Sequence, residues 1–122
     1  MHELSIASAI LALALKGADE RRISAVGVRI GHLRQVVPSS LTFSFALLAE
    51  GTAAEGARLE IEGVPVAGMC RGCGAESELR GFPFACGICG GTSLEVVRGE
   101  ELRVEWLDVE EDAGARAEAP AA

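Results

Sequence analysis

The chain has 122 residues, which is enough for one domain, or for one domain and a small satellite. Apolar residues make up 49% of it, so a hydrophobic core is expected. The formal net charge of −7 argues against a nucleic-acid-binding protein, because such proteins bind phosphates through clustered Lys and Arg. The apolar run Ile6–Leu15 is too short to span a membrane and has no basic segment before it, so a cytoplasmic protein is expected.

The first two predicted elements are a helix and a strand. Apolar residues from Leu4 to Leu15 recur at the spacing of one helical face, and Gly17 is expected to end this helix. From Ile23 to Ile30 the larger apolar residues alternate with smaller or polar ones, which predicts a half-buried strand.

A second helix and a second strand are predicted next. Pro38-Ser39-Ser40 is a helix-start signal, and an apolar stripe follows it up to Gly51. Leu59 and Ile61 alternate with glutamates, which predicts a strand that runs toward Pro65.

The last predicted elements are two strands and a tail. Leu94–Arg98 and Glu101–Leu107 are expected to form strands joined by Gly99-Glu100, a two-residue hairpin loop with glycine first. The final strands are expected to return to the first sheet, because the last of them has an apolar face that needs a partner. From Glu110 onward the chain is rich in Ala and acidic residues without periodicity, which is typical of disorder.

These elements predict an α+β fold, in which a small module of two helices and a three-stranded sheet carries an inserted rubredoxin-like or zinc-ribbon lobe. The expected domains are a discontinuous α/β module at 1–66 plus 93–109, a metal lobe at 67–92 and a disordered tail at 110–122.

The cysteines form the most specific motif in the chain. Cys70-x-x-Cys73 is followed after twelve residues by Cys86-x-x-Cys89, and two such pairs typically supply four thiolates to one tetrahedral metal. Two disulfides would need an oxidising compartment, and a redox C-x-x-C would not need a second pair. Structural zinc is therefore expected, and iron in a rubredoxin-like centre fits the same ligands.

The N-terminus offers a second set of metal ligands. The α-amine of Met1, the backbone nitrogen of His2 and the His2 imidazole can close fused chelate rings, and the Glu3 amide or carboxylate is near enough to complete them. Planar, nitrogen-rich coordination suits Ni(II) or Cu(II) better than zinc. The simpler interpretation is an exposed histidine without a function. His32, the other histidine, is expected to be a solvated loop residue.

Taken together, these motifs resemble the HypA/HybF family, the nickel metallochaperones of [NiFe]-hydrogenase maturation. The resemblance rests on the opening Met1–Ser5, on Ala53–Ala57 before the second strand and on the two cysteine pairs, and it extends to about Asp108. It implies that the α/β module binds nickel, a transported Ni(II), through His2 with amine and backbone nitrogens from Met1 and Glu3. The same resemblance makes a structural Zn(II) the metal of Cys70, Cys73, Cys86 and Cys89.

The resemblance also implies a function other than catalysis. Such a protein would deliver nickel to the hydrogenase large-subunit precursor together with a nickel GTPase. Urease maturation proteins are further partners under this interpretation, and it allows a weak homodimer. Members often carry acidic residues where this chain has Val37-Pro38-Ser39-Ser40, so a nickel or docking role of those acids is not carried over. The alternatives from the residues alone are a zinc-ribbon adaptor between proteins, without a nickel function, and a rubredoxin-like electron carrier.

Overall fold

The computed structural model describes residues 2–110 and 116–118 of the chain. Contacts between residues divide it into two compact units. The helical unit comprises Met1–Arg29, Val36–Glu62 and Leu102–Ala122, and the cysteine unit comprises Ile30–Gln35 and Gly63–Glu101.

Two helices lie in the helical unit, as the apolar periodicity predicts. Helix α1 spans His2–Ala18, one residue beyond the predicted stop at Gly17, and it ends where Asp19 and Glu20 take positive φ angles of 50° and 69°. Helix α2 spans Pro38–Ala49, with proline in its first turn, where the missing amide donor is not needed.

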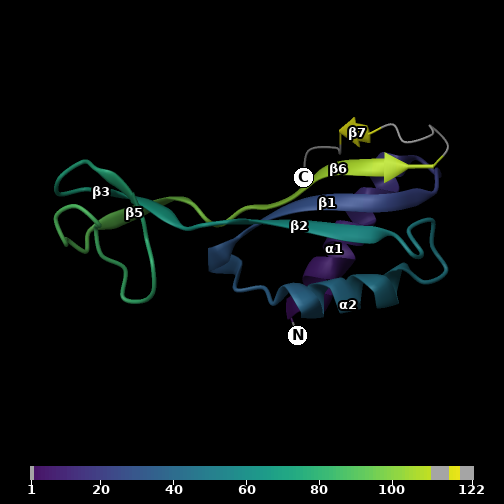
Figure 1. Ribbon diagram of the computed structural model, residues 1–122, viewed down its shortest axis with the longest axis horizontal. Coiled ribbons are helices and arrows are strands. Elements are labelled where there is room, and N and C mark those ends of the chain that lie inside the picture. Colours follow the sequence, from purple (N-terminus) through teal and green to yellow (C-terminus); the bar gives the residue numbers. More distant parts are fainter. Residues whose placement is uncertain (1, 111–115, 119–122) are drawn as a thin grey trace. The chain divides into compact units, whose positions relative to one another are not determined.

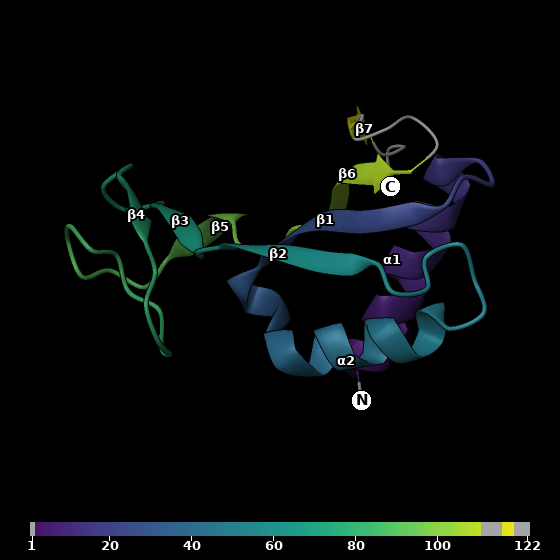
Figure 2. The ribbon, with the colours of Figure 1, turned by 45° about the vertical axis from the view of Figure 1, so that its right-hand side comes forward.

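The sheet of the helical unit has the strand order β2-β1-β6-β7. Its strands are β1 (Ile23–Gly31), β2 (Arg58–Val64), β6 (Leu102–Val109) and the short β7 (Arg116–Glu118). Both helices cover one face of the sheet in the two views of the ribbon (Figure 1, Figure 2). The α+β fold with two helices is confirmed, with β7 as an additional strand at the edge.

Strand β1 is more deeply buried than its alternating sequence predicts. Val26 and Val28 are buried on one face, and Ala25 is buried as well, although alternation directs it to the other face. The indole of Trp106 covers Gly27 on that second face, because a Cβ built on Gly27 would lie 2.0 Å from the ring. The prediction of a half-buried strand is therefore wrong, and the small residues of β1 make room for a side chain from β6.

The cysteine unit contains the second sheet, with the order β4-β3-β5. Its strands are β3 (Ala67–Cys70), β4 (Glu76–Glu78) and β5 (Leu94–Arg98), and a 3₁₀ helix, η1 (His32–Arg34), belongs to the same unit. Strand β3 pairs antiparallel with both neighbours.

The predicted hairpin between 94–98 and 101–107 is wrong. Strand β5 pairs with β3 inside the cysteine unit, whereas β6 joins the other sheet. Gly99 lies between them with φ 113° and packs against Val66, where a Cβ would approach the Val66 Cα to 2.7 Å. The glycine is needed for this close passage of two chain segments and not for a hairpin turn.

The predicted disordered tail is only partly described. Residues 116–118 form β7, in which Ala117 is paired with Leu107 of β6, so this part of the prediction is wrong. Residues 111–115 and 119–122 of the predicted tail lie outside the described residues. Within 2–110 and 116–118, no helix has the length and apolar character that a bilayer crossing requires.

Candidate metal sites

The two cysteine pairs form turns with the same hydrogen bonds. The carbonyl of Cys70 accepts from the Gly74 amide at 2.8 Å, and the carbonyl of Cys86 accepts from the Gly90 amide at 2.9 Å. Gly74 and Gly90 have φ angles of 76° and 77°, a left-handed conformation that favours glycine. The glycines after the pairs therefore let each turn fold back so that both of its sulfurs point to one side.

The four sulfurs converge on one point. All four Sγ atoms lie within 4.8 Å of one another, with Cys70 and Cys89 at 3.6 Å and Cys73 and Cys86 at 3.7 Å. Tetrahedral zinc with Zn–S bonds of about 2.3 Å places its sulfurs about 3.8 Å apart. These separations are far beyond a disulfide bond of about 2 Å. The sequence-predicted cysteines are thus brought together in the geometry of a single metal site.

Backbone amides point at the buried sulfurs. The amide of Cys73 donates to Cys70 Sγ at 3.5 Å, and the amides of Ile88 and Cys89 donate to Cys86 Sγ at 3.4 and 3.5 Å. The Cys89 and Ile88 amides lower the pKa of Cys86 to about 6, and the amides of Cys73 and Gly72 lower the pKa of Cys70. These donors favour the thiolate, the form that binds metal.

The pKa of Cys73 is shifted in the opposite direction, upward. The Ala75 amide lowers its pKa, but burial and the three neighbouring thiols outweigh this and raise the pKa to about 11. Four thiolates confined within 4.8 Å repel one another, so a cluster without a cation retains protons. A divalent ion displaces those protons, and metal binding at this site is therefore linked to proton release.

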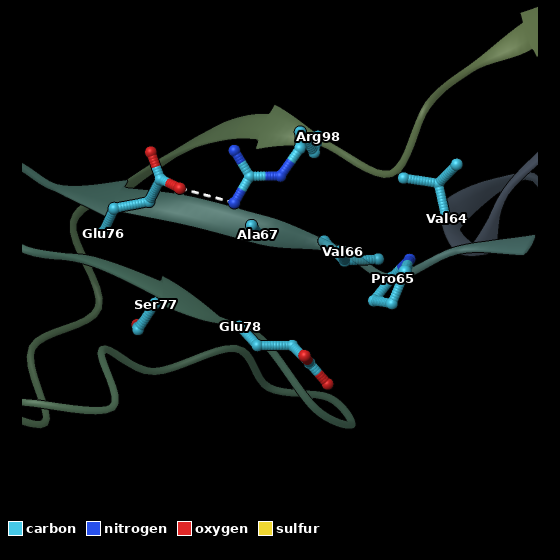
Figure 3. A pocket seen from close by; sticks show the side chains of 8 residues that line it. All are labelled: Val64, Pro65, Val66, Ala67, Glu76, Ser77, Glu78 and Arg98. Atoms are coloured by element: carbon cyan, nitrogen blue, oxygen red, sulfur yellow. Dashed lines mark hydrogen bonds and ion pairs between the residues drawn. The ribbon is translucent and has the colours of Figure 1, made fainter.

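A shallow pocket of about 230 Å³ lies elsewhere in the cysteine unit, and no thiol lines it. Figure 3 shows Arg98 and Glu76 joined by an ion pair, with Glu78 on the same strand as Glu76. Glu78 is also paired, with Arg80 Nε at 3.1 Å from its carboxylate. Because both carboxylates are engaged by guanidinium groups, the pocket does not offer a set of free metal ligands.

At the other candidate site, His2 is the first described residue of α1. Its side chain is 51% exposed, and its amide lies in the first helical turn, where N–H groups have no acceptor within the helix. Met1 lies outside the described residues.

Glu3 is the buried charged residue of this end. A Glu3 carboxylate oxygen accepts the Val37 amide at 3.0 Å and lies 3.7 Å from His2 Nε2. The Val37 amide is the main cause of a lowered Glu3 pKa, and the carboxylate thereby ties the first turn of α1 to the start of α2. The sequence does not reveal the role of Val37, because the contact uses a backbone amide.

His32 lies at the start of η1 and is exposed, in agreement with the prediction. Its ring packs over Gly63, where a Cβ would lie 2.8 Å from Nε2. Among the residues that the structure describes, the four cysteines are the only group of three or more potential metal ligands.

Comparison with known proteins finds one family that matches most of the chain. Residues 1–109 match a family model described as hydrogenase/urease nickel incorporation, metallochaperone, hypA. The hydrogenase maturation factor HypA of Geobacter metallireducens is 46% identical over 110 residues, covering 90% of this chain and all of that protein. The HypA of Trichodesmium erythraeum is 38% identical over 112 residues, covering 91% of this chain and 97% of its own.

Solved structures agree with the fold. The solution structure of the nickel metallochaperone HypA from Helicobacter pylori has a TM-score of 0.63 and 23% identity, and the match covers 88% of this chain and 96% of that one. A second HypA solution structure matches with a TM-score of 0.65 and 24% identity.

Proposed function

Because this chain belongs to the HypA family of hydrogenase maturation factors, we propose that it binds Ni(II) at its N-terminus and delivers it to the large-subunit precursor of a [NiFe]-hydrogenase. The family consists of nickel-incorporation metallochaperones and not of enzymes, so its activity is metal transfer. The observation that supports the N-terminal site is the position of His2, exposed on the first turn of α1 and beside a buried carboxylate.

The proposed nickel ligands are mainly nitrogens. The Met1 amine, the His2 backbone nitrogen and the His2 imidazole form fused chelate rings, and Glu3 is the proposed source of a further ligand, through its backbone nitrogen or its side chain. One Glu3 carboxylate oxygen accepts the Val37 amide, so a side-chain ligand from Glu3 would use the other oxygen. Amides of the first helical turn have no intrahelical acceptor, so losing their protons to a metal breaks no helical hydrogen bond.

The proposed metal of Cys70, Cys73, Cys86 and Cys89 is a structural zinc. The sulfur separations suit tetrahedral coordination, and all four positions are taken by protein ligands, as in closed structural sites. A closed structural site of this kind does not by itself indicate what the protein does. Its proposed role is to hold the cysteine unit in shape.

The proposed partners are a hydrogenase-maturation nickel GTPase and the large-subunit precursor, in the cytoplasm. Urease maturation proteins are a second proposed acceptor, because the matching family model names both hydrogenase and urease. A terminal chelate suits transfer, since an acceptor can exchange its ligands one at a time.

Calorimetric titration with Ni(II) tests the proposal on zinc-loaded protein with a native, untagged Met1. We expect one stoichiometric site in the wild type and none in His2→Ala. The control is His32→Ala, which removes the other histidine and should leave the titration unchanged. Equal binding by wild type and His2→Ala, or binding by neither, would contradict the nickel function. The remaining interpretation would be a zinc-stabilised adaptor between proteins.

Acidification gives a second test of the same site. Nickel must displace protons from the amine, the imidazole and the amides, so affinity should fall from about pH 7.5 to about pH 6, across the reference titrations of imidazole and α-amine. Affinity that stays constant over this range would contradict the terminal chelate.

A further inference from the structure

Helix α2 exposes two large apolar side chains on the face opposite its buried one. One face buries Leu41, Phe45 and Ala49 in the core of the helical unit. On the outer face, Phe43 is 70% exposed and Leu47, one turn further, is 52% exposed. The exposed polar residues of α2 are the uncharged Ser39, Ser40 and Thr42. No charged residue occurs between Pro38 and Ala49, whereas the outer face of a surface helix usually carries charges. Exposed apolar side chains grouped in this way are typical of an interaction surface.

This outer face begins at the proposed nickel site. Val37, the residue before α2, donates its amide to the Glu3 carboxylate beside His2, and its own side chain is 51% exposed. A helical rise of about 1.5 Å per residue places Phe43 about 9 Å and Leu47 about 15 Å along the axis from Val37. A protein that covers about 800 Å² of this surface can therefore contact the outer face and reach His2 together.

We propose that the outer face of α2, formed by Phe43 and Leu47, together with the exposed side chain of Val37 before the helix, is the docking surface for the protein that receives nickel from His2. The proposal rests on the nickel function proposed above. The occupant follows from two features of the face. An acceptor must bring its own ligands to His2, so it has to bind at this end of the helical unit. Its contacting surface is apolar, because a charged group pressed against α2 would lose water and find no opposite charge.

The test compares two pairs of exposed residues in binding to the immobilised hydrogenase large-subunit precursor. The double variant Phe43→Ser/Leu47→Ser removes the outer face of α2. The control is Phe82→Ser/Val97→Ser, which removes two exposed apolar residues of the cysteine unit that lie outside the cysteine turns, with 71% and 38% exposure. We expect the dissociation constant to rise at least about tenfold for the α2 variant and less than about threefold for the control.

Nickel titration of the same variants separates this proposal from the function on which it rests. Loss of precursor binding with unchanged nickel affinity supports the docking surface. Precursor binding that is equal in wild type and α2 variant, or that falls equally in both variants, overturns it. If the wild type binds the precursor through α2 but takes up no nickel, the nickel function fails and the docking of a nickel acceptor fails with it.

A second variant tests whether the outer face of α2 binds another copy of this chain instead. Ala46 is exposed on the same face, and Ala46→Arg places a charge there while keeping Phe43 and Leu47. We expect this variant to weaken precursor binding, with sedimentation equilibrium showing the same monomer mass as the wild type. A wild-type dimer that Ala46→Arg dissociates would assign the face to self-association and overturn the proposal.

Discussion

The helical unit and the cysteine unit bury different kinds of side chain. Among the described residues, the largest side chains with less than 2% exposure include Phe45, Ile10 and Leu41 of the helical unit, and the cysteine unit contributes only Cys70 to this group. The helical unit therefore has an apolar core of its own, and burial of that core stabilises it. The cysteine unit buries fewer large side chains, chiefly Ile30, Val64, Val66 and Leu79 beside two of the thiols, so its stability depends more on what the thiols bind.

Removal of the metal should give the largest difference between the units. Binding of structural zinc contributes about 10–16 kcal/mol in zinc-finger peptides, so a chelator strong enough to take the metal should unfold the cysteine unit. We expect amide resonances of residues 67–98 to collapse toward random-coil positions in ¹⁵N-HSQC spectra, while those of β1 and β6 persist.

The control for metal removal is re-addition of zinc, which should restore the original spectrum. Loss of the β1 and β6 resonances on chelation would show that the helical unit depends on the metal as well, and the contrast between the two units would then be wrong.

A core truncation should act mainly on the helical unit. Phe45 is 1% exposed, so Phe45→Ala should lower the free energy of unfolding of this unit by about 3–5 kcal/mol through lost burial and a residual cavity. Phe43→Ala, two residues earlier but 70% exposed, is the matched control and should change it by less than about 0.5 kcal/mol. Urea denaturation followed by far-UV circular dichroism measures both, and equal losses would contradict the assigned core.

Enlarging Gly27, a small residue of β1, should destabilise the helical unit nearly as much as Phe45→Ala does. A Cβ on Gly27 would lie 2.0 Å from the Trp106 ring, so Gly27→Ala must displace the indole, at a cost of about 1–3 kcal/mol. Trp106 is the single tryptophan, and its emission should shift to longer wavelength as it becomes more exposed to water. Arg103→Ala, at an exposed position of β6, should leave the emission unchanged.

The contrast between the units also explains which features the sequence could predict. Helix α1 and strand β2 were predictable because local periodicity and turn residues determine them. The cysteine cluster was predictable because two short turns suffice to converge four sulfurs. In each case the signal lies within a few residues of the structure that it specifies.

Features that depend on contacts between distant segments were not predictable. The hairpin at Gly99 was a wrong prediction because a positive φ suits a turn and also a close passage against Val66. The burial of β1 depends on Trp106, more than seventy residues away in the sequence. At the nickel end, Val37 contributes a backbone amide, which no residue type signals.

The smallest predicted effect concerns that amide and is a change with pH. In the nickel-free protein, the Val37 amide holds the Glu3 pKa below its ordinary value of 4.5, whereas the unfolded chain has the ordinary value. Glu3 therefore contributes stability above the unfolded pKa, and this contribution is lost as the pH falls through the lower, folded pKa. Glu3→Gln should be less stable than the wild type at neutral pH, and the two should converge as the pH falls below about 4.5.

Urea denaturation from about pH 7 to about pH 3 measures this convergence, with Glu50→Gln, at an exposed position, as the control for loss of a carboxylate. Curves for wild type and Glu3→Gln that stay parallel over the whole range would mean that the carboxylate does not hold the start of α2. The link between α1 and α2 would then depend on apolar packing alone. The contact between Glu3 and the Val37 amide would contribute nothing measurable to the free energy of unfolding.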